Sequence, residues 1–275
     1  MFTRSAALLP PLRIGMDHSM STPAPTLVQS LANPTRFMAL SKTMLPWLVA
    51  LTAVVMAYGL YLAFAVSPAD YQQGETVRIM YVHVPSAWLS MMGYLLVAAS
   101  SFGLLVFRHP LADVSARAAA PIGAAFTALA LITGSLWGRP MWGTYWVWDA
   151  RLTSVLLLFF LYLGLMALRS SVEDETSASK LPAILSLVGV SLLPVIHYSV
   201  EWWSSLHQPS TKFTTTLDAS FRMPLLVNAL GFTLLFACLH MKAMRNEVLR
   251  RRVKALQIAA VRHAGARATP KGKEP

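Results

Sequence analysis

The chain has 275 residues and a formal net charge of +11, and 55% of its residues are hydrophobic while only 13% are charged. Soluble domains carry about 25% charged residues, so this composition indicates an integral membrane protein and excludes an ordinary soluble domain. The single cysteine excludes an internal disulfide, a CxxC redox pair and a CxxCH haem-attachment site. The sequence also lacks a glycine-rich phosphate loop and the HExxH pattern of zinc proteases.

Six apolar stretches follow one another along the chain, each close to the roughly 20 residues that a helix needs to cross a bilayer core. None carries a charge near its middle, and the loops between them are short. Because lipid offers no hydrogen-bond partner for backbone groups, such stretches must be helices. We therefore predict an all-α integral membrane protein, a bundle of six transmembrane helices over residues 45–66, 86–107, 118–137, 152–168, 181–200 and 222–242.

The distribution of Lys and Arg predicts the orientation of these helices, because cytoplasmic loops carry the excess of basic residues. Eighteen of the 23 basic residues lie in the two tails and in the second and fourth loops. The other five lie on the opposite side and are Arg78, Arg139, Arg151, Lys212 and Arg222. We expect both termini in the cytoplasm, the protein in the bacterial inner membrane, and the first, third and fifth loops in the periplasm.

Three regions are expected along the chain. Residues 1–43 contain five prolines and no continuous apolar segment of the signal-peptide kind, which predicts a flexible cytoplasmic extension. Residues 44–243 form the six-helix membrane domain, and residues 244–275 form a basic cytoplasmic tail. The run of arginines at 250–252 is expected to meet anionic membrane lipid, with no nucleic acid as a partner.

The third loop lies in the segment WGRPMWGTYWVWDARLT, residues 137–153, which contains four of the eight tryptophans of the chain: Trp137, Trp142, Trp146 and Trp148. One interpretation is a belt of aromatic side chains at the membrane surface. Gly138, Pro140 and Gly143 argue against a long helix here, so the alternative is a shaped loop that presents its rings as a platform. Trp142 and Trp146 would share a face if the middle of the segment formed a helical turn.

Two histidines lie at the outer ends of predicted spans. His83 comes just before the second span and His197 lies near the end of the fifth, so both imidazoles are expected at the depth of the tryptophan segment. A lone histidine near a helix end is more often a hydrogen-bonding interface residue than a ligand. Two of them beside an aromatic platform suit haem, whose iron accepts imidazole on both axial faces and whose ring offers aromatic contact. His207 is the reserve ligand.

Charged residues on the same side complete the candidate site. Arg78, Arg139 and Arg151 are placed to pair with the propionates of haem. Asp149 is a candidate N-cap of the fourth span. It is also a candidate for a charged hydrogen bond to Arg151 or Arg139 that would orient the loop.

The tryptophan segment resembles the WWD domain of a family of haem-handling proteins, in the pattern WGxxWxWDxRLT at residues 142–153. The flanking YVHVPSAW (81–88) and PVIHYSVEWW (194–203) and the six spans make the chain most similar to the haem exporter protein C (CcmC) branch of cytochrome c-type biogenesis proteins. The resemblance covers roughly residues 45–245. Tyr145 stands where close relatives are expected to have tryptophan, which keeps an aromatic surface with a smaller ring.

The resemblance implies a function in haem delivery. Such proteins hold haem b as a carried ligand at the periplasmic face, with the WWD loop against the ring and two histidines, here His83 and His197, as axial ligands. They deliver it to a periplasmic haem chaperone (CcmE-like), with a small one-span protein (CcmD-like) and an ATP-binding cassette complex (CcmA/CcmB-like). The site then consists of the two ligands with Trp137, Trp142, Tyr145, Trp146, Trp148, Asp149, Arg78, Arg139 and Arg151.

Two other classes of function stay open from the residues alone. A b-type haem electron-transfer subunit would also use paired histidines, but its ligands usually lie within the helices and often in two pairs. A small-molecule transporter would usually carry charged or broken-helix features near the midplane of the bilayer. An enzyme is the weakest interpretation, because no nucleophile–base set is evident, so we expect no catalytic residue.

Overall fold

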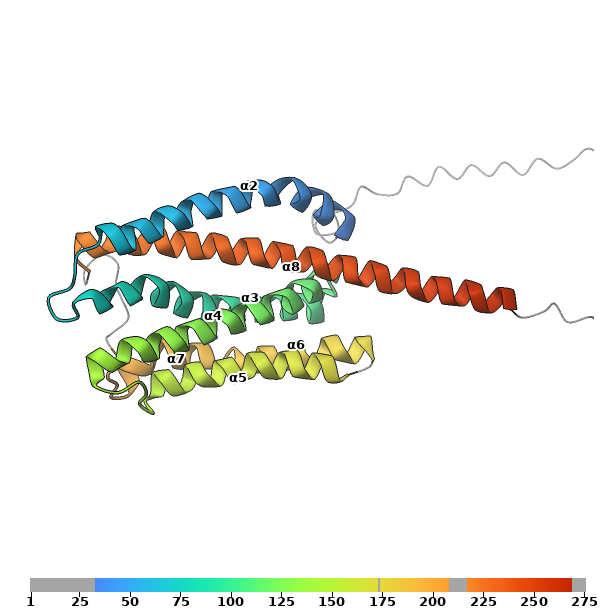
Figure 1. Ribbon diagram of the computed structural model, residues 1–275. Helices are drawn as coiled ribbons and strands as arrows, with labels where there is room; N and C mark the ends of the chain where they lie inside the picture. The colour runs from blue at the N-terminus through green and yellow to red at the C-terminus, as the bar shows by residue number, and fades with distance from the viewer. Residues whose placement is uncertain (1–32, 173, 208–216, 269–275) are drawn as a thin grey trace, which may run out of the picture.

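The computed structural model of the protein describes residues 33–172, 174–207 and 217–268, and these residues contain no β-strand (Figure 1). Six of its helical stretches are long and apolar enough to cross a membrane, which confirms the predicted all-α membrane bundle. The fifth stretch is made of two helices, α6 and α7. The α-helices are α2 (Pro34–Tyr61), α3 (Met80–Phe107), α4 (Pro110–Trp142), α5 (Ala150–Ser171), α6 (Glu175–Gly189), α7 (Leu192–Trp202) and α8 (Ala219–Ala268).

Several helices begin at a side chain that satisfies their first backbone N–H groups. The Asn33 side chain accepts hydrogen bonds from the backbone of Thr35 and Arg36 at the start of α2, where Pro34 suits the first turn. Asp174 caps α6 in the same way by accepting from the backbone N–H of Ser177. These caps show that α2 and α6 begin in polar sequence, before the apolar stretches. A hydropathy pattern alone does not detect such helix starts.

The helices extend beyond the apolar stretches. The start of α2 makes residues 34–43 of the expected flexible extension helical, while residues 1–32 lie outside the described residues. The expected basic tail continues α8 as a helix up to Ala268. His83, expected just before a span, lies inside the first turns of α3. The chain between α2 and α3 contains a π-helix, η1 (Leu62–Val66), and a 3₁₀-helix, η2 (Glu75–Ile79).

The described helices lie side by side, with α3 and α4 at the centre (Figure 1). On one side they contact α8, which separates them from the outermost helix, α2; on the other side they contact α5 and α6. The connections 62–79, 143–149 and 203–207 gather at one end, which we call the tryptophan end. The start of α2, the α3–α4 and α5–α6 connections and the emerging part of α8 gather at the other, which we call the basic end.

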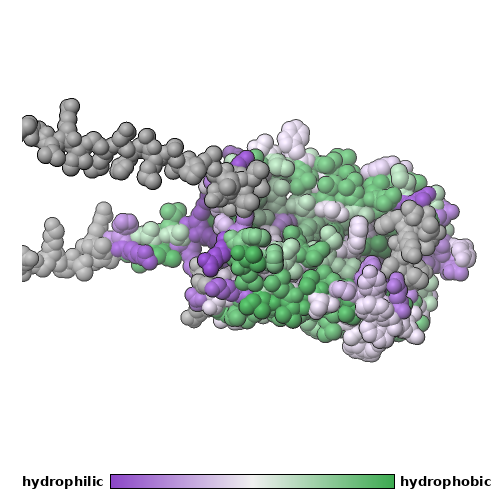
Figure 2. All heavy atoms as spheres, turned by 180° about the vertical axis from the view of Figure 1, so that it is seen from behind, coloured by the Kyte–Doolittle hydropathy of each residue, from purple (hydrophilic) through white to green (hydrophobic). Residues whose placement is uncertain are grey.

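The surface agrees with a membrane location. Figure 2 shows a broad hydrophobic area along the side of the bundle, with hydrophilic residues at its two ends, one of them where the last part of α8 leaves it. The interior is held together by closely packed side chains, among which Tyr94, Leu158 and Tyr162 are fully buried. The hydroxyl of Tyr162 lies directly against Gly123 and donates to the backbone carbonyl of Ser90 at 2.8 Å. A small residue at this contact lets neighbouring helices approach closely.

Candidate functional site

The predicted tryptophan loop is only partly irregular. Residues 137–142 form the last turns of α4, and the helix ends at Gly143, whose φ of 76° is the left-handed geometry that favours glycine. Residues 143–149 are irregular, and α5 begins at Ala150. Trp142 and Trp146 therefore share no helical face, because the chain leaves the helix between them.

Asp149 joins the tryptophan segment to the last loop of the tryptophan end. One carboxylate oxygen accepts from the backbone N–H of Leu152 at 2.8 Å, which confirms the predicted N-cap of α5. The other accepts from the hydroxyl of Ser205 at 2.5 Å and from Nδ1–H of His207 at 2.9 Å. Burial alone would raise the pKa of Asp149, but these hydrogen bonds outweigh it and lower that pKa below its usual value. The side chains that bind Asp149 across the loops are thus Ser205 and His207, rather than Arg151 or Arg139.

His207 lies between a carboxylate and an aromatic ring. Its Nδ1 faces Asp149, and its ring meets that of Trp142 at a centroid distance of 4.7 Å. Burial lowers the pKa of His207, and the opposing effect of Asp149 does not restore it, so the imidazole is neutral at pH 7. Trp142 is itself held against Gly138, where a Cβ atom would lie 2.8 Å from the indole. From the sequence, His207 is expected only as a reserve ligand, and no pattern in it points to Ser205.

His83 is half-buried between α3 and α4. Its Nδ1 lies 3.0 Å from the hydroxyl oxygen of Thr133, and that hydroxyl donates its proton to the carbonyl of Leu129 at 2.6 Å. With that proton directed at Leu129, Thr133 accepts from His83, which favours the tautomer that has its proton on Nδ1 and its lone pair on Nε2. A Cβ atom at Gly134 would come within 2.9 Å of the imidazole, so this glycine makes room for the ring.

Trp137 connects His83 to the first loop. Its indole packs edge-on against the imidazole of His83, with ring centroids 5.7 Å apart. The indole N–H donates to the side-chain carbonyl of Gln73 at 2.8 Å. The same indole packs on a buried apolar cluster that includes Val77 and Tyr81. Gln73 was not recognised from the sequence, because nothing in its local pattern points to a contact 64 residues away.

Arg151 connects the tryptophan segment to the helix that carries His197. Its guanidinium donates to the hydroxyl of Ser199 at 3.2 Å and to the backbone carbonyl of His197 at 3.1 Å. The imidazole of His197 takes no part in this contact: it is exposed, and its ring centroid lies 4.7 Å from that of Tyr198. Arg151 therefore fixes the backbone at His197 while leaving the imidazole exposed.

The two other predicted arginines also bind backbone carbonyls. Arg78 donates to the carbonyls of Ala63 and Phe64 at 2.7 and 2.8 Å and pairs with Glu75. These carbonyls belong to η1, so Arg78 holds the end of the first membrane-spanning stretch against η2.

Arg139 donates to the carbonyl of Gly143, and its guanidinium lies over the ring of Tyr145 at 5.5 Å. This contact steadies the turn that leaves α4.

The remaining aromatic residues of the segment form an open surface. Trp148 is 77% exposed and Tyr145 is 56% exposed. Trp146 is half-buried and packs edge-on against Trp148 with centroids 5.5 Å apart. The buried indole N–H of Trp146 has no hydrogen-bond partner among the described residues. Large exposed rings beside an unpaired donor are typical of a surface that meets another molecule.

His197 borders an apolar groove of about 520 Å³ on the side of the bundle. The groove lies between α3 and the α6–α7 junction and is lined by residues that include Met91, Leu95, Pro194 and Tyr198. His83 is not part of its lining. The structure thus links each histidine to the tryptophan segment separately, His83 through Trp137 and His197 through Arg151.

Known proteins resemble this chain over most of its length. The family model described as heme exporter protein C matches residues 27–259. A protein of that name from Bradyrhizobium diazoefficiens is 62% identical over 231 residues, which cover 83% of this chain and 88% of that protein. Those from Escherichia coli K12 and Paracoccus denitrificans are 48% and 44% identical, over 81% and 82% of this chain and 91% and 95% of theirs. The chain therefore belongs to the haem exporter protein C family, a membrane component of haem transport in cytochrome c maturation.

Proposed function

We propose that the tryptophan end holds haem at the periplasmic face of the bacterial inner membrane and delivers it to a periplasmic haem chaperone. The observation that carries this proposal is that the tryptophan segment contacts α3, α7 and the last loop, each of which carries a histidine. It contacts His83 through Trp137, the backbone of His197 through Arg151, and His207 through Asp149. A segment that positions three histidines is suited to present an iron-containing ligand.

We assign the axial positions to His83 and His197. Histidines that bind metal usually donate their other ring N–H to a protein acceptor, and His83 does so to Thr133 while its Nε2 stays available. His197 borders a groove of about 520 Å³, within the range of roughly 300–1,000 Å³ typical of small-molecule sites. The apolar lining of this groove suits the porphyrin of haem b, the form that we propose as the cargo.

The side chains of the segment then have distinct roles. Trp148 and Tyr145 offer exposed rings to the haem and to the chaperone that receives it. Asp149 holds the tryptophan segment against the last loop, and Arg151 holds it against α7. The protein itself contributes no catalytic group. Arg139 is exposed and is the best placed of the three arginines to meet a propionate, since Arg78 is occupied by two carbonyls and a carboxylate.

The excess of basic residues at one end of the bundle supports the proposed orientation. The tryptophan end then faces the periplasm, where a haem chaperone of the CcmE kind would meet the exposed aromatic surface. The name of the relatives, heme exporter protein C, supports the further proposal of CcmD-like and CcmA/CcmB-like partners.

The experiment that tests this function is haem transfer in membranes that contain this protein and a haem chaperone of the same maturation system. We expect covalent haem–chaperone product when the intact protein is present and a loss of most of that product when His83 or His197 is replaced by alanine. Leu256→Ala, at an exposed position on the distant part of α8, is the matched control. Equal product from all variants at equal protein level would refute the proposal.

A further inference from the structure

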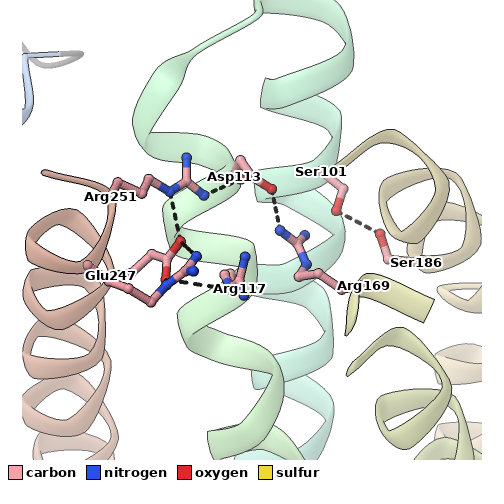
Figure 3. A network of polar contacts seen from close by, with 8 residues as sticks. Ser101, Asp113, Arg117, Arg169, Ser186, Glu247 and Arg251 are labelled. Carbon is pink, nitrogen blue, oxygen red and sulfur yellow. Dashed lines mark hydrogen bonds and ion pairs between the residues drawn. The ribbon is translucent and has the colours of Figure 1, made fainter. Parts of the chain in front are cut away.

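A network of charged side chains crosses the basic end (Figure 3). Its centre consists of two acids that are almost buried, Asp113 of α4 and Glu247 of α8, whose side chains are 10% and 8% exposed. Asp113 pairs with Arg169 of α5 at 2.5 Å and with Arg251 of α8. Glu247 binds Arg250 and Arg251 at 2.7 Å each. The network therefore ties α4, α5 and α8 together through opposite charges.

The network contains more positive than negative charge. Arg117 of α4 is a fourth arginine around the two carboxylates, so the ion pairs of the described residues bring four arginines to two acids. Its Nε lies 3.4 Å from Glu247, and its guanidinium makes no hydrogen bond to any residue that the structure describes. The side chain is 37% exposed. The terminal N–H groups of this arginine therefore bind no described residue and can meet an anion.

Arg117 and Arg169 line a cavity of about 220 Å³ between α3, α4, α5 and α6. The wall is otherwise mostly apolar and includes Val97, Leu165 and Met166. Its volume lies below the roughly 300 Å³ at which pockets begin to bury a drug-sized molecule, so neither a porphyrin nor a nucleotide fits. A phosphate group with part of an alkyl chain matches both its size and its mixture of two guanidinium groups with an apolar wall.

We propose that this cavity binds the headgroup of an anionic phospholipid. The phosphate would be held by Arg117 and Arg169, because guanidinium groups bind phosphate oxygens through paired hydrogen bonds. A lipid is favoured over a free phosphate because an inorganic ion makes no favourable contact with the apolar wall, whereas an acyl chain does. Basic pockets between transmembrane helices on the cytoplasmic side bind anionic headgroups in this way. The site is separate from the haem-handling tryptophan end and from the exposed arginines of the tail.

The test is native mass spectrometry of the full chain in detergent with added phosphatidylglycerol or phosphatidylcholine. We expect the protein to retain phosphatidylglycerol preferentially and Arg117→Gln to weaken that retention about five-fold, as expected for one basic residue near anionic lipid. The matched control is Arg252→Gln, which removes the same charge from the same end at a residue that contacts Thr35 and does not line the cavity. It should leave retention unchanged.

Three results would overturn the proposal. Equal retention of the two lipids by the unmodified protein excludes a specific anionic site, whatever the variants do. An equal loss in Arg252→Gln indicates diffuse attraction to the whole basic end. Displacement of phosphatidylglycerol by equimolar glycerol 3-phosphate identifies a free-phosphate site rather than a lipid site.

Arg117→Lys, which keeps the charge, serves as the folding control and should retain most of the binding.

Discussion

The carboxylate of Asp149 has two separable roles. One oxygen caps α5 and the other binds Ser205 and His207, which belong to a different loop. Asparagine caps helices about as well as aspartate, but its amide N–H₂ group cannot accept hydrogen bonds. A change from aspartate to asparagine therefore separates the cap from the link between the loops.

We predict that Asp149→Asn keeps α5 intact and weakens the link to His207. Hydrogen bonds to charged groups contribute about 1.5–3 kcal/mol, so haem transfer to the chaperone should fall several-fold at matched protein level. Ser205→Ala removes one of the two bonds and should have a smaller effect. Transfer at the unmodified level by Asp149→Asn would reduce this residue to a helix cap and remove it from the site.

A pH effect is expected from His207. Because burial lowers its pKa below 6.5, the folded state binds this proton less readily than the unfolded state. The contribution of His207 to stability is therefore fully present above the unfolded-state pKa of 6.5 and is lost as the pH falls from there to the lower pKa of the folded state. Between about pH 7.5 and 5.5, the melting temperature in detergent should fall more for the unmodified protein than for His207→Asn, which does not titrate. Parallel pH curves for the two proteins would show that this histidine is not perturbed.

The sequence predicts local features of the site better than its distant contacts. The N-cap at Asp149 could be predicted, because capping depends on the few residues that follow. The pairing of Asp149 with His207 could not, because the two are 58 residues apart and no periodicity relates them. The same holds for Thr133, which orients His83 from a different helix. The assignment of His83 and His197 as ligands came from their matched depth beside the tryptophan segment and from the family resemblance, and it stays a prediction.

At the scale of the elements, hydropathy predicts the number of spans but not their ends. The six apolar stretches correspond to the six candidate membrane spans of the described chain, because each must bury its backbone hydrogen bonds within itself. α4 nevertheless continues to Trp142 through Gly138 and Pro140, which were expected to break it. Pro140 stands in the last turn, three residues before the C-cap at Gly143. The break between α6 and α7 was also missed.

The tryptophan segment should matter more for delivery of haem than for its ligation. Replacing Trp142, Trp146 and Trp148 together by alanine removes the exposed rings and the contact with His207, while the contacts of His83 with Thr133 and Trp137 stay in place. We expect covalent haem–chaperone product to fall at least several-fold while bound haem falls less.

The measurement compares chaperone-bound haem with haem retained on the purified protein. Trp47→Ala, at an exposed tryptophan of α2, is the control for general effects on the membrane interface. A normal yield of product from the triple variant would support the simpler aromatic-belt interpretation.

At the scale of the whole molecule, the two ends of the bundle differ in chemistry. The basic end carries the charged network, the start of α2 and the last part of α8 (Figures 1 and 3). The tryptophan end carries the aromatic surface with His83, His197 and His207. Charge asymmetry of this kind sets orientation during insertion. The sequence predicts this division because the count of Lys and Arg needs no knowledge of packing.

We predict that the two ends lie on opposite sides of the membrane. An impermeant maleimide added to intact cells should label Tyr71→Cys, which is 91% exposed at the tryptophan end, but should label Leu256→Cys only after permeabilisation. The native Cys238 is buried and serves as the unlabelled background. Labelling of Leu256→Cys in intact cells would reverse the proposed orientation.

The central claim is that His83 and His197 hold the iron of haem, and the most direct measurement is the absorption spectrum of the protein purified in detergent. We predict bound haem with the spectrum of bis-imidazole iron, and a loss of haem or a shifted spectrum in both His83→Ala and His197→Ala. His207→Ala should keep the ligation and change the spectrum little. Well-folded His83 and His197 variants with unchanged haem content and spectra, or a spectrum that changes only in His207→Ala, would contradict the account.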